Sequence, residues 1–278
     1  MRRIAVVPTL LTLGNAICGF AAIACASKIT GNAAESDQWF ALSGWLIIAA
    51  MIFDGLDGYV ARIAKTASRF GGELDSLCDA VSFGVAPAFL LLKMGPGWEP
   101  QPLLHQLLAG IATLYMVCAI LRLARFNVDN TPDPAAHKRF RGLPSPGAAG
   151  CIASLAILRG GLPDKIIAVW HDAPPEAIRQ LVDRMVEVSA PIGALCVALL
   201  MVSIIPYPHV TKQVLRGKRH VGHLIQVLLA AFIIFLIREL ALFLLFWVYA
   251  LGVPLRYAIM KQLKKAAPIP RLDDVRPQ

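Results

Sequence analysis

The chain has 278 residues, of which 57% are hydrophobic and only 16% are charged, and its mean hydropathy of +0.62 is too high for an ordinary water-soluble domain. Its formal net charge of +9 does not require a nucleic-acid partner, because the basic residues stand beside long apolar runs, as they do on the cytoplasmic side of a membrane. We therefore expect an all-α, polytopic membrane helix bundle with no nucleic-acid partner.

The first apolar run extends from about residue 4 to residue 26 and contains polar side chains at Thr12 and Asn15. Its end, Ala24–Ala26, imitates the cleavage site of a secretory signal peptide. Because such polar residues are unusual in a signal core, we expect a retained membrane span. Thr12 and Asn15 are then expected either to face a ligand or to make hydrogen bonds between helices.

Two further spans are expected at about residues 39–64 and 74–92, after a polar loop at residues 28–38. Each span carries a pair of aspartates at one end. These are Asp54 and Asp57 near the end of one span, and Asp75 and Asp79 near the start of the next. Because the two ends are joined by a short connection, both pairs are expected at the same face of the membrane.

The spacing of the aspartates is helical. At about 100° per residue, the first pair shares a helix face with Gly58, Ala61 and Arg62, and the second pair shares a face with Ser82. A turn is expected at residues 66–68 together with Gly71 and Gly72. This turn places the two acidic faces opposite each other, so that four carboxylates line one cleft.

A cluster of carboxylates inside an apolar bundle is unfavourable without cations. Two carboxylates about 5 Å apart at an effective dielectric constant of about 20 repel each other by roughly 3 kcal/mol, and each ionised aspartate deep in a span costs about 2.5–3.5 kcal/mol to insert. Mg²⁺ and Mn²⁺ favour carboxylate oxygens and keep positions open for water or phosphate. The four aspartates therefore predict a metal site, which we expect to hold two ions.

Small residues stand next to the acids in the sequence. They are Gly55, Gly58, Ala61, Gly71 and Gly72. Short side chains let a phosphate ligand approach the backbone and the metal site closely, and the planar guanidinium of Arg62 can bind phosphate oxygens. Metals, glycines and an arginine together indicate a diphosphate ligand.

The pattern D-x2-D-G-x2-A-R-x8-G-x3-D-x3-D, which begins at Asp54 and ends at Asp79, resembles the signature of the CDP-alcohol phosphotransferases. These are integral membrane enzymes that use Mg²⁺ or Mn²⁺ to displace CMP from a CDP-linked donor with an alcohol. The resemblance implies metal ligands at Asp54, Asp57 and Asp75, with Asp79 as general base and as a further contact to metal. It also implies a CDP site at Gly58, Ala61, Arg62 and Gly71.

The remaining chain predicts more spans and loops. They are a fourth span at about residues 103–123, a basic connection at 122–150, a short fifth span at 146–158, a polar segment at 159–187 with a short surface helix at 176–188, and a sixth span at 188–205. The apolar stretch 224–259 is about 54 Å long as one helix, which exceeds a bilayer core of about 30 Å. Because Arg238 and Glu239 lie in its middle, we expect a hairpin of two spans.

About eight spans follow, a six-helix catalytic core and a C-terminal hairpin, with both termini inside. This count leaves 20 of the 27 basic residues on the inside, whereas a seven-span alternative leaves 14, so the excess of basic residues on cytoplasmic segments favours eight spans. We expect residues 1–265 to form the membrane domain and residues 266–278 a flexible cytoplasmic tail. The aspartates then face the cytoplasm, and for a bacterial protein the membrane is the inner membrane.

Three other stretches narrow the resemblance. DAVSFGVAPAF (residues 79–89), RLARFN (122–127) and FRGLPSPGAAG (140–150) resemble the bacterial CDP-diacylglycerol–serine phosphatidyltransferases. The resemblance implies CDP-diacylglycerol as donor, L-serine as acceptor and membrane lipids as surroundings. Candidates to bind the serine carboxylate are Arg122, Arg125, Lys138, Arg139 and Arg141. Of the acceptor-side residues, Arg125 and Asn127 are preferred.

Other interpretations remain open. Within the family, the acceptor can instead be glycerol 3-phosphate or inositol phosphate. Acids within membrane spans also occur in cation or proton transporters, and a scaffold that only binds lipid is a third alternative. A homodimer is compatible with the sequence.

Overall fold

The computed structural model describes residues 6–30, 33–64, 68–95, 102–129, 142–169, 175–207 and 238–266. All regular elements in these ranges are helices, which confirms the all-α expectation. They are α1 (Val6–Ser27), α2 (Ala33–Ile63), α3 (Arg69–Asp79), the π-helical turn η1 (Ala80–Val85), α4 (Ala86–Met94), α5 (Pro102–Asp129), α6 (Ser145–Val169), α7 (Pro175–Val202) and α10 (Arg238–Ala266).

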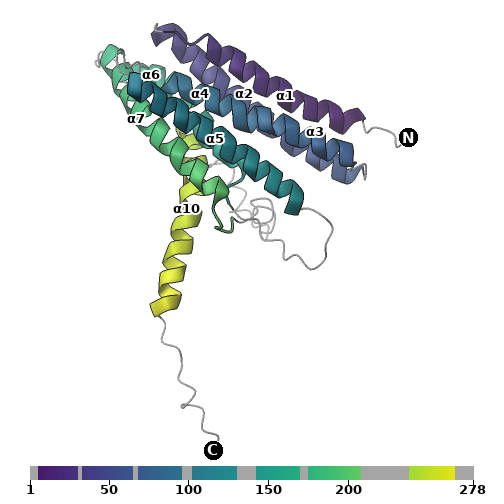
Figure 1. The fold of residues 1–278 in the computed structure, drawn as a ribbon. Coiled ribbons are helices and arrows are strands. Elements are labelled where there is room, and N and C mark those ends of the chain that lie inside the picture. Colours follow the sequence, from purple (N-terminus) through teal and green to yellow (C-terminus); the bar gives the residue numbers. More distant parts are fainter. Residues whose placement is uncertain are drawn as a thin grey trace, which may run out of the picture.

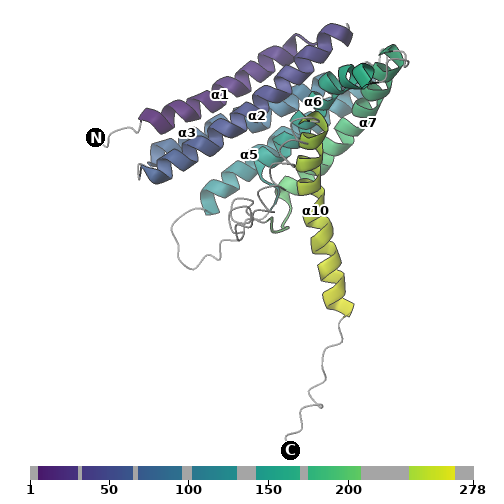
Figure 2. The same ribbon diagram turned by 180° about the vertical axis from the view of Figure 1, so that it is seen from behind.

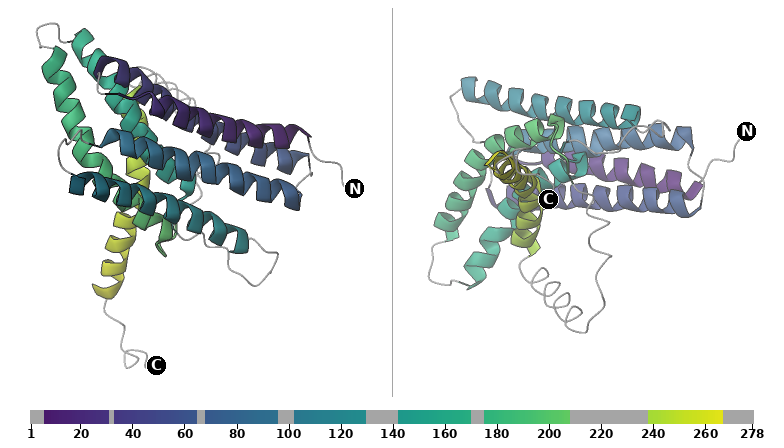
Figure 3. Two further views of the ribbon diagram at one scale, coloured as in Figure 1. Left: turned by 45° about the horizontal axis from the view of Figure 1, so that its top comes forward. Right: turned by 90° about the horizontal axis from the view of Figure 1, so that it is seen from below.

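The helices form one bundle. Helices α1, α2 and α5 lie alongside the continuous rod of α3, η1 and α4 (Figure 1). Helix α6 packs against α2, and α7 packs against α5 and α6 (Figure 2). The first part of α10 packs against α6, and the rest extends away from the bundle (Figure 3).

Small residues allow the helices to approach closely. Helix α6 buries Ala149, Ala153 and Ala156 completely. A Cβ atom on Gly44 of α2 would lie 2.6 Å from Ile157 Cγ1 and 2.7 Å from the Ala153 carbonyl oxygen. Membrane helices associate through this kind of close packing, because lipid is as apolar as their side chains. Glycine at position 44 is therefore required for the contact between α2 and α6.

Within the described ranges, six helical segments are long and apolar enough to cross a membrane. They are Val6–Ser27, Glu35–Ile63, Phe70–Met94, Pro102–Val128, Glu176–Val202 and Arg238–Gln262. The structure thus supports an integral membrane protein. Helix α6, which contains the predicted fifth span, is not among the six.

The C-terminal predictions are only partly covered by the structure. Helix α10 begins at Arg238, where the predicted hairpin turns. The first arm of that hairpin and the tail after residue 266 lie outside the described residues, so the count of eight spans stays a prediction.

Several predicted boundaries are wrong, and in each case a helix continues through polar residues. Helix α2 begins at Ala33, inside the predicted polar loop, and α5 continues to Asp129, into the predicted basic connection. Helix α6 reaches Val169, and the predicted surface helix is the first half of α7. Hydropathy alone marks the membrane-buried part of a helix, while backbone hydrogen bonding continues beyond it.

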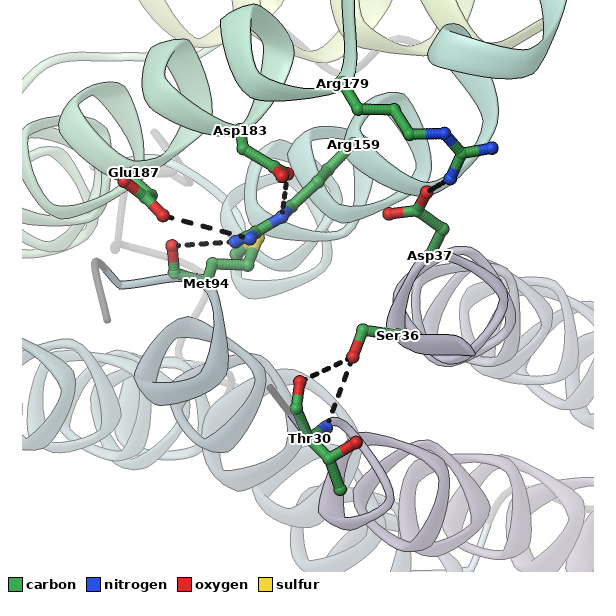
Figure 4. A network of polar contacts seen from close by, with 8 residues as sticks. All are labelled: Thr30, Ser36, Asp37, Met94, Arg159, Arg179, Asp183 and Glu187. Carbon is green, nitrogen blue, oxygen red and sulfur yellow. Dashed lines mark hydrogen bonds and ion pairs between the residues drawn. The ribbon is translucent and has the colours of Figure 1, made fainter. Parts of the chain in front are cut away.

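Ion pairs join the helices at the end of the bundle opposite the aspartate pairs (Figure 4). Arg159 of α6 lies with its Nε atom 2.7 Å from Asp183 Oδ1 of α7, and its Nη1 donates to the Met94 carbonyl oxygen of α4 at 3.2 Å. Its guanidinium also covers the ring of Phe40 of α2 at 4.3 Å. Arg179 of α7 forms a short ion pair with Asp37 of α2. Asp37 and Asp183 at this end are therefore each paired with an arginine.

Replacing Arg159 by Ala should lower the stability of the bundle. The change leaves the Asp183 carboxylate without its close cation. It also removes hydrogen bonds that the charged guanidinium donates, and each such bond typically contributes about 1.5–3 kcal/mol to stability. Thermal unfolding in detergent should show a clearly lower midpoint than wild type. Arg184→Ala, which removes an exposed arginine from the neighbouring helix α7, should change the midpoint much less. Equal midpoints for the two variants would contradict the role given to Arg159.

Candidate active site

The two aspartate pairs meet at one end of the bundle. Helix α2 ends and α3 begins at the same end as the start of α1 (Figure 1). Ser68 caps α3, because its side chain accepts a hydrogen bond from the Gly71 N–H at 3.0 Å. The predicted turn is therefore wrong in its second half: Gly71 and Gly72 belong to the first turn of α3, and serine at the cap satisfies a free helix donor.

Three of the four aspartates form a compact group. Asp54, Asp57 and Asp75 each place a carboxylate oxygen so that these atoms all lie within 4.8 Å of one another. Asp57 Oδ2 and Asp75 Oδ1 are buried and have no hydrogen-bond partner among the described residues. Buried polar atoms are normally satisfied, and closely spaced carboxylate oxygens are the donors that hard divalent cations prefer. The donor set therefore fits a bound metal ion.

Asp79 lies outside this group of three. It is buried, and its Oδ1 atom accepts a hydrogen bond of 2.9 Å from the amide Nδ2 of Asn15. Asn15 is itself fully buried on α1. Of the two roles expected for Asn15, the structure shows the hydrogen bond between helices. The acceptor is Asp79, which is itself a predicted site residue.

The predicted CDP-binding residues surround open space. A Cβ atom built on Gly58 has no atom within 4 Å, and one on Gly71 meets only Ser68 Oγ at 3.2 Å. Ala61 is half-buried, and Arg62 is exposed in the last turn of α2. These residues lie beside the acids and leave room for a ligand.

Helix α5 brings polar residues to the same end. Asn127 of α5 and Ser76 of α3 are joined by hydrogen bonds between their side chains. The distance from Asn127 Nδ2 to Ser76 Oγ is 2.8 Å. Arg125 is exposed. The other candidates, Lys138, Arg139 and Arg141, lie outside the described residues.

Arg122 has the most distinctive environment of the described candidates. Its Nη1 donates to Ser145 Oγ of α6 at 2.9 Å, and its Nε is buried without a hydrogen-bond partner in the described part of the chain. The guanidinium also lies within electrostatic range of Asp79. The sequence offered Arg122 as one of five similar cations, because the contact between α5 and α6 that distinguishes it is tertiary.

The family model for CDP-alcohol phosphatidyltransferase matches residues 5–173, a segment that contains all four aspartates. The chain belongs to this family. A CDP-diacylglycerol–serine O-phosphatidyltransferase of Mycobacterium bovis is 40% identical over 161 residues, which cover 55% of this chain and 49% of that protein. The enzyme of the same name from Helicobacter pylori strain J99 is 36% identical over 152 residues, covering 54% of this chain and 57% of that protein.

An archaetidylserine synthase of Methanothermobacter thermautotrophicus is 33% identical over 207 residues, covering 73% of this chain and 70% of that protein. The matches to the bacterial relatives span only about half of their length. Membership of the CDP-alcohol phosphatidyltransferase family supports transferase chemistry with a divalent metal, in agreement with the donor set on α2 and α3.

Replacing Asp75 by Asn should weaken metal binding without unfolding the protein. The change removes one charged oxygen donor from the group of three. Replacing a residue that only hydrogen-bonds a metal ligand already costs about 10–100-fold in metal affinity. We therefore expect loss of a ligand itself to lower the affinity at least about tenfold. Mn²⁺ titration followed by electron paramagnetic resonance measures this directly. Glu73→Gln, which neutralises an exposed carboxylate on the same helix, should leave Mn²⁺ affinity unchanged.

Proposed function

We propose that this protein is a phosphatidylserine synthase, which transfers the phosphatidyl group of CDP-diacylglycerol to the hydroxyl group of L-serine and releases CMP. The observation that carries the proposal is the group of three carboxylates with unpartnered buried oxygens, one helical turn away from the separately held Asp79. The names of the bacterial relatives support serine as acceptor.

Each side chain has a distinct role in the proposed reaction. Asp54, Asp57 and Asp75 hold two divalent cations, Mg²⁺ or Mn²⁺, with Asp79 as a further contact. When bound, these cations neutralise charge on the diphosphate of the donor. Gly58, Ala61 and Gly71 leave space for the CDP moiety beside the acids, and Arg62 binds phosphate oxygens.

Asp79 is the proposed general base. It takes the proton of the serine hydroxyl as the oxygen attacks the phosphorus attached to diacylglycerol, and the bond from that phosphorus to the CMP oxygen breaks. The hydrogen bond from Asn15 fixes the orientation of its carboxylate. No covalent enzyme intermediate is required, because the attacking group is the acceptor itself.

The proposed location is the bacterial inner membrane, with the aspartates at the cytoplasmic face. Exposed Arg62 and Arg125 lie at the aspartate end of the bundle, as the excess of basic residues on cytoplasmic segments requires. A CDP-activated donor is expected on that side of the membrane.

The proposed reaction is tested by supplying purified protein with CDP-diacylglycerol, Mn²⁺ or Mg²⁺, and one acceptor at a time, and then measuring CMP release. L-serine should support turnover, whereas glycerol 3-phosphate and inositol phosphate should not. Asp79→Asn should reduce kcat by at least about a hundredfold, as loss of a general base typically does, and should leave binding of the CDP-lipid largely intact. Near-normal turnover by Asp79→Asn would rule out its role as base.

Arg122 and Arg125 can be distinguished on the acceptor side. Because Arg122 has a buried Nε without a partner, we expect it to bind the serine carboxylate, and Arg122→Ala should raise the KM for serine by about tenfold or more. The KM for CDP-diacylglycerol should change far less. Arg125→Ala, from the same helix, tests the residue that the sequence favoured. A raised serine KM in Arg125→Ala alone would assign the acceptor to Arg125.

A further inference from the structure

The rod formed by α3, η1 and α4 changes its helical geometry directly after Asp79. Residues Ala80–Val85 form a π-helical turn, in which the Ala86 N–H donates to the Val81 carbonyl, five residues earlier. Single π-helical turns within α-helices are rare and occur frequently at functional sites.

Pro87 follows two residues after this turn. In a regular α-helix the Phe83 carbonyl accepts from the N–H of residue 87, but proline has no N–H, and its ring clashes with that carbonyl. The backbone N–H that would bond the Phe83 carbonyl in a regular α-helix is therefore missing at residue 87.

Tyr115 of α5 supplies a donor to this carbonyl. Its hydroxyl donates to the Phe83 carbonyl oxygen at 3.1 Å, and the whole Tyr115 side chain is inaccessible to solvent. Phenylalanine would fill nearly the same volume without the donor. The hydroxyl therefore has a specific partner, which packing alone does not require.

The π-helical turn is also hydrogen-bonded to Asn15 of α1, the residue whose side chain donates to Asp79. Ser82 Oγ donates to the main-chain carbonyl oxygen of Asn15 at 2.9 Å, while the Asn15 side chain donates to Asp79. The approach is close, since a Cβ atom on Gly19 would lie 2.4 Å from Ser82 Oγ and 2.7 Å from Ser82 Cα. A movement of the π-helical turn therefore moves both Asp79 and its hydrogen-bond donor.

We propose that Tyr115 is a positioning residue for the transfer reaction: its hydroxyl holds the π-helical turn at Phe83 and thereby fixes the Asp79 carboxylate against Asn15. Tyr115 itself touches neither substrate nor metal. The inference rests on the proposed role of Asp79 as general base, and it adds a residue on another helix that sets the geometry of that base.

The test is Tyr115→Phe, with Ser43→Ala as matched control. Ser43 also donates a fully buried hydroxyl to a carbonyl of a neighbouring helix, that of Ala22 at 2.9 Å, but this hydrogen bond joins α2 to α1 and involves neither the turn nor the aspartates. Tyr115→Phe should lower kcat at least about threefold, the effect of one lost buried hydrogen bond. The KM for CDP-diacylglycerol and the Mn²⁺ affinity should stay within about twofold of wild type.

Hydrogen exchange provides a readout that does not depend on activity. Amides in a peptide covering residues 80–90 should exchange faster in Tyr115→Phe than in wild type, and Ser43→Ala should leave this peptide unchanged. Wild-type kcat together with wild-type exchange in Tyr115→Phe would overturn the inference, as would an equal loss of kcat in Ser43→Ala. If wild-type protein releases no CMP, the proposed function fails, and the exchange measurement still decides whether Tyr115 holds the turn.

Discussion

The structure depends on keeping three carboxylates together at one end of an apolar helix bundle. Their oxygen atoms lie within 4.8 Å of one another, and at that distance the repulsion between each pair is about 3 kcal/mol at an effective dielectric constant of about 20. Two of the oxygens are buried without a partner among the described residues. A divalent cation would remove this repulsion, so the packing that brings α2 and α3 together also assembles a candidate metal site.

The two ends of the bundle treat their acids differently. At the end opposite the site, Asp37 and Asp183 are paired with arginines, so each charge is compensated within the protein. At the site end, no ion pair joins the group of three to a basic side chain in the described ranges. The acids at one end are thus compensated by arginines of the protein, whereas those at the other end form a donor set that a divalent cation could compensate.

The sequence by itself determined the class of the fold and indicated the acidic residues of the candidate site. Composition fixed the membrane environment, because so apolar a chain cannot cover its surface with polar groups. The helical spacing from Asp54 to Asp79 predicted a shared acidic face, and the structure brings Asp54, Asp57 and Asp75 together. Local periodicity is sufficient for such predictions, since residues three and four apart lie on the same side of a helix.

Only the tertiary structure decided which polar residues support the acids. The contact of Asn15 with Asp79 joins residues 64 positions apart. Arg122 differs from the exposed Arg125 through its bond to Ser145 on another helix and its buried Nε. Pro87 is visible in the sequence and disfavours a regular helix, but the donor that reaches the Phe83 carbonyl comes from Tyr115 on α5. Spacing along one helix carries no information about such partners, because they are selected by how separate helices pack.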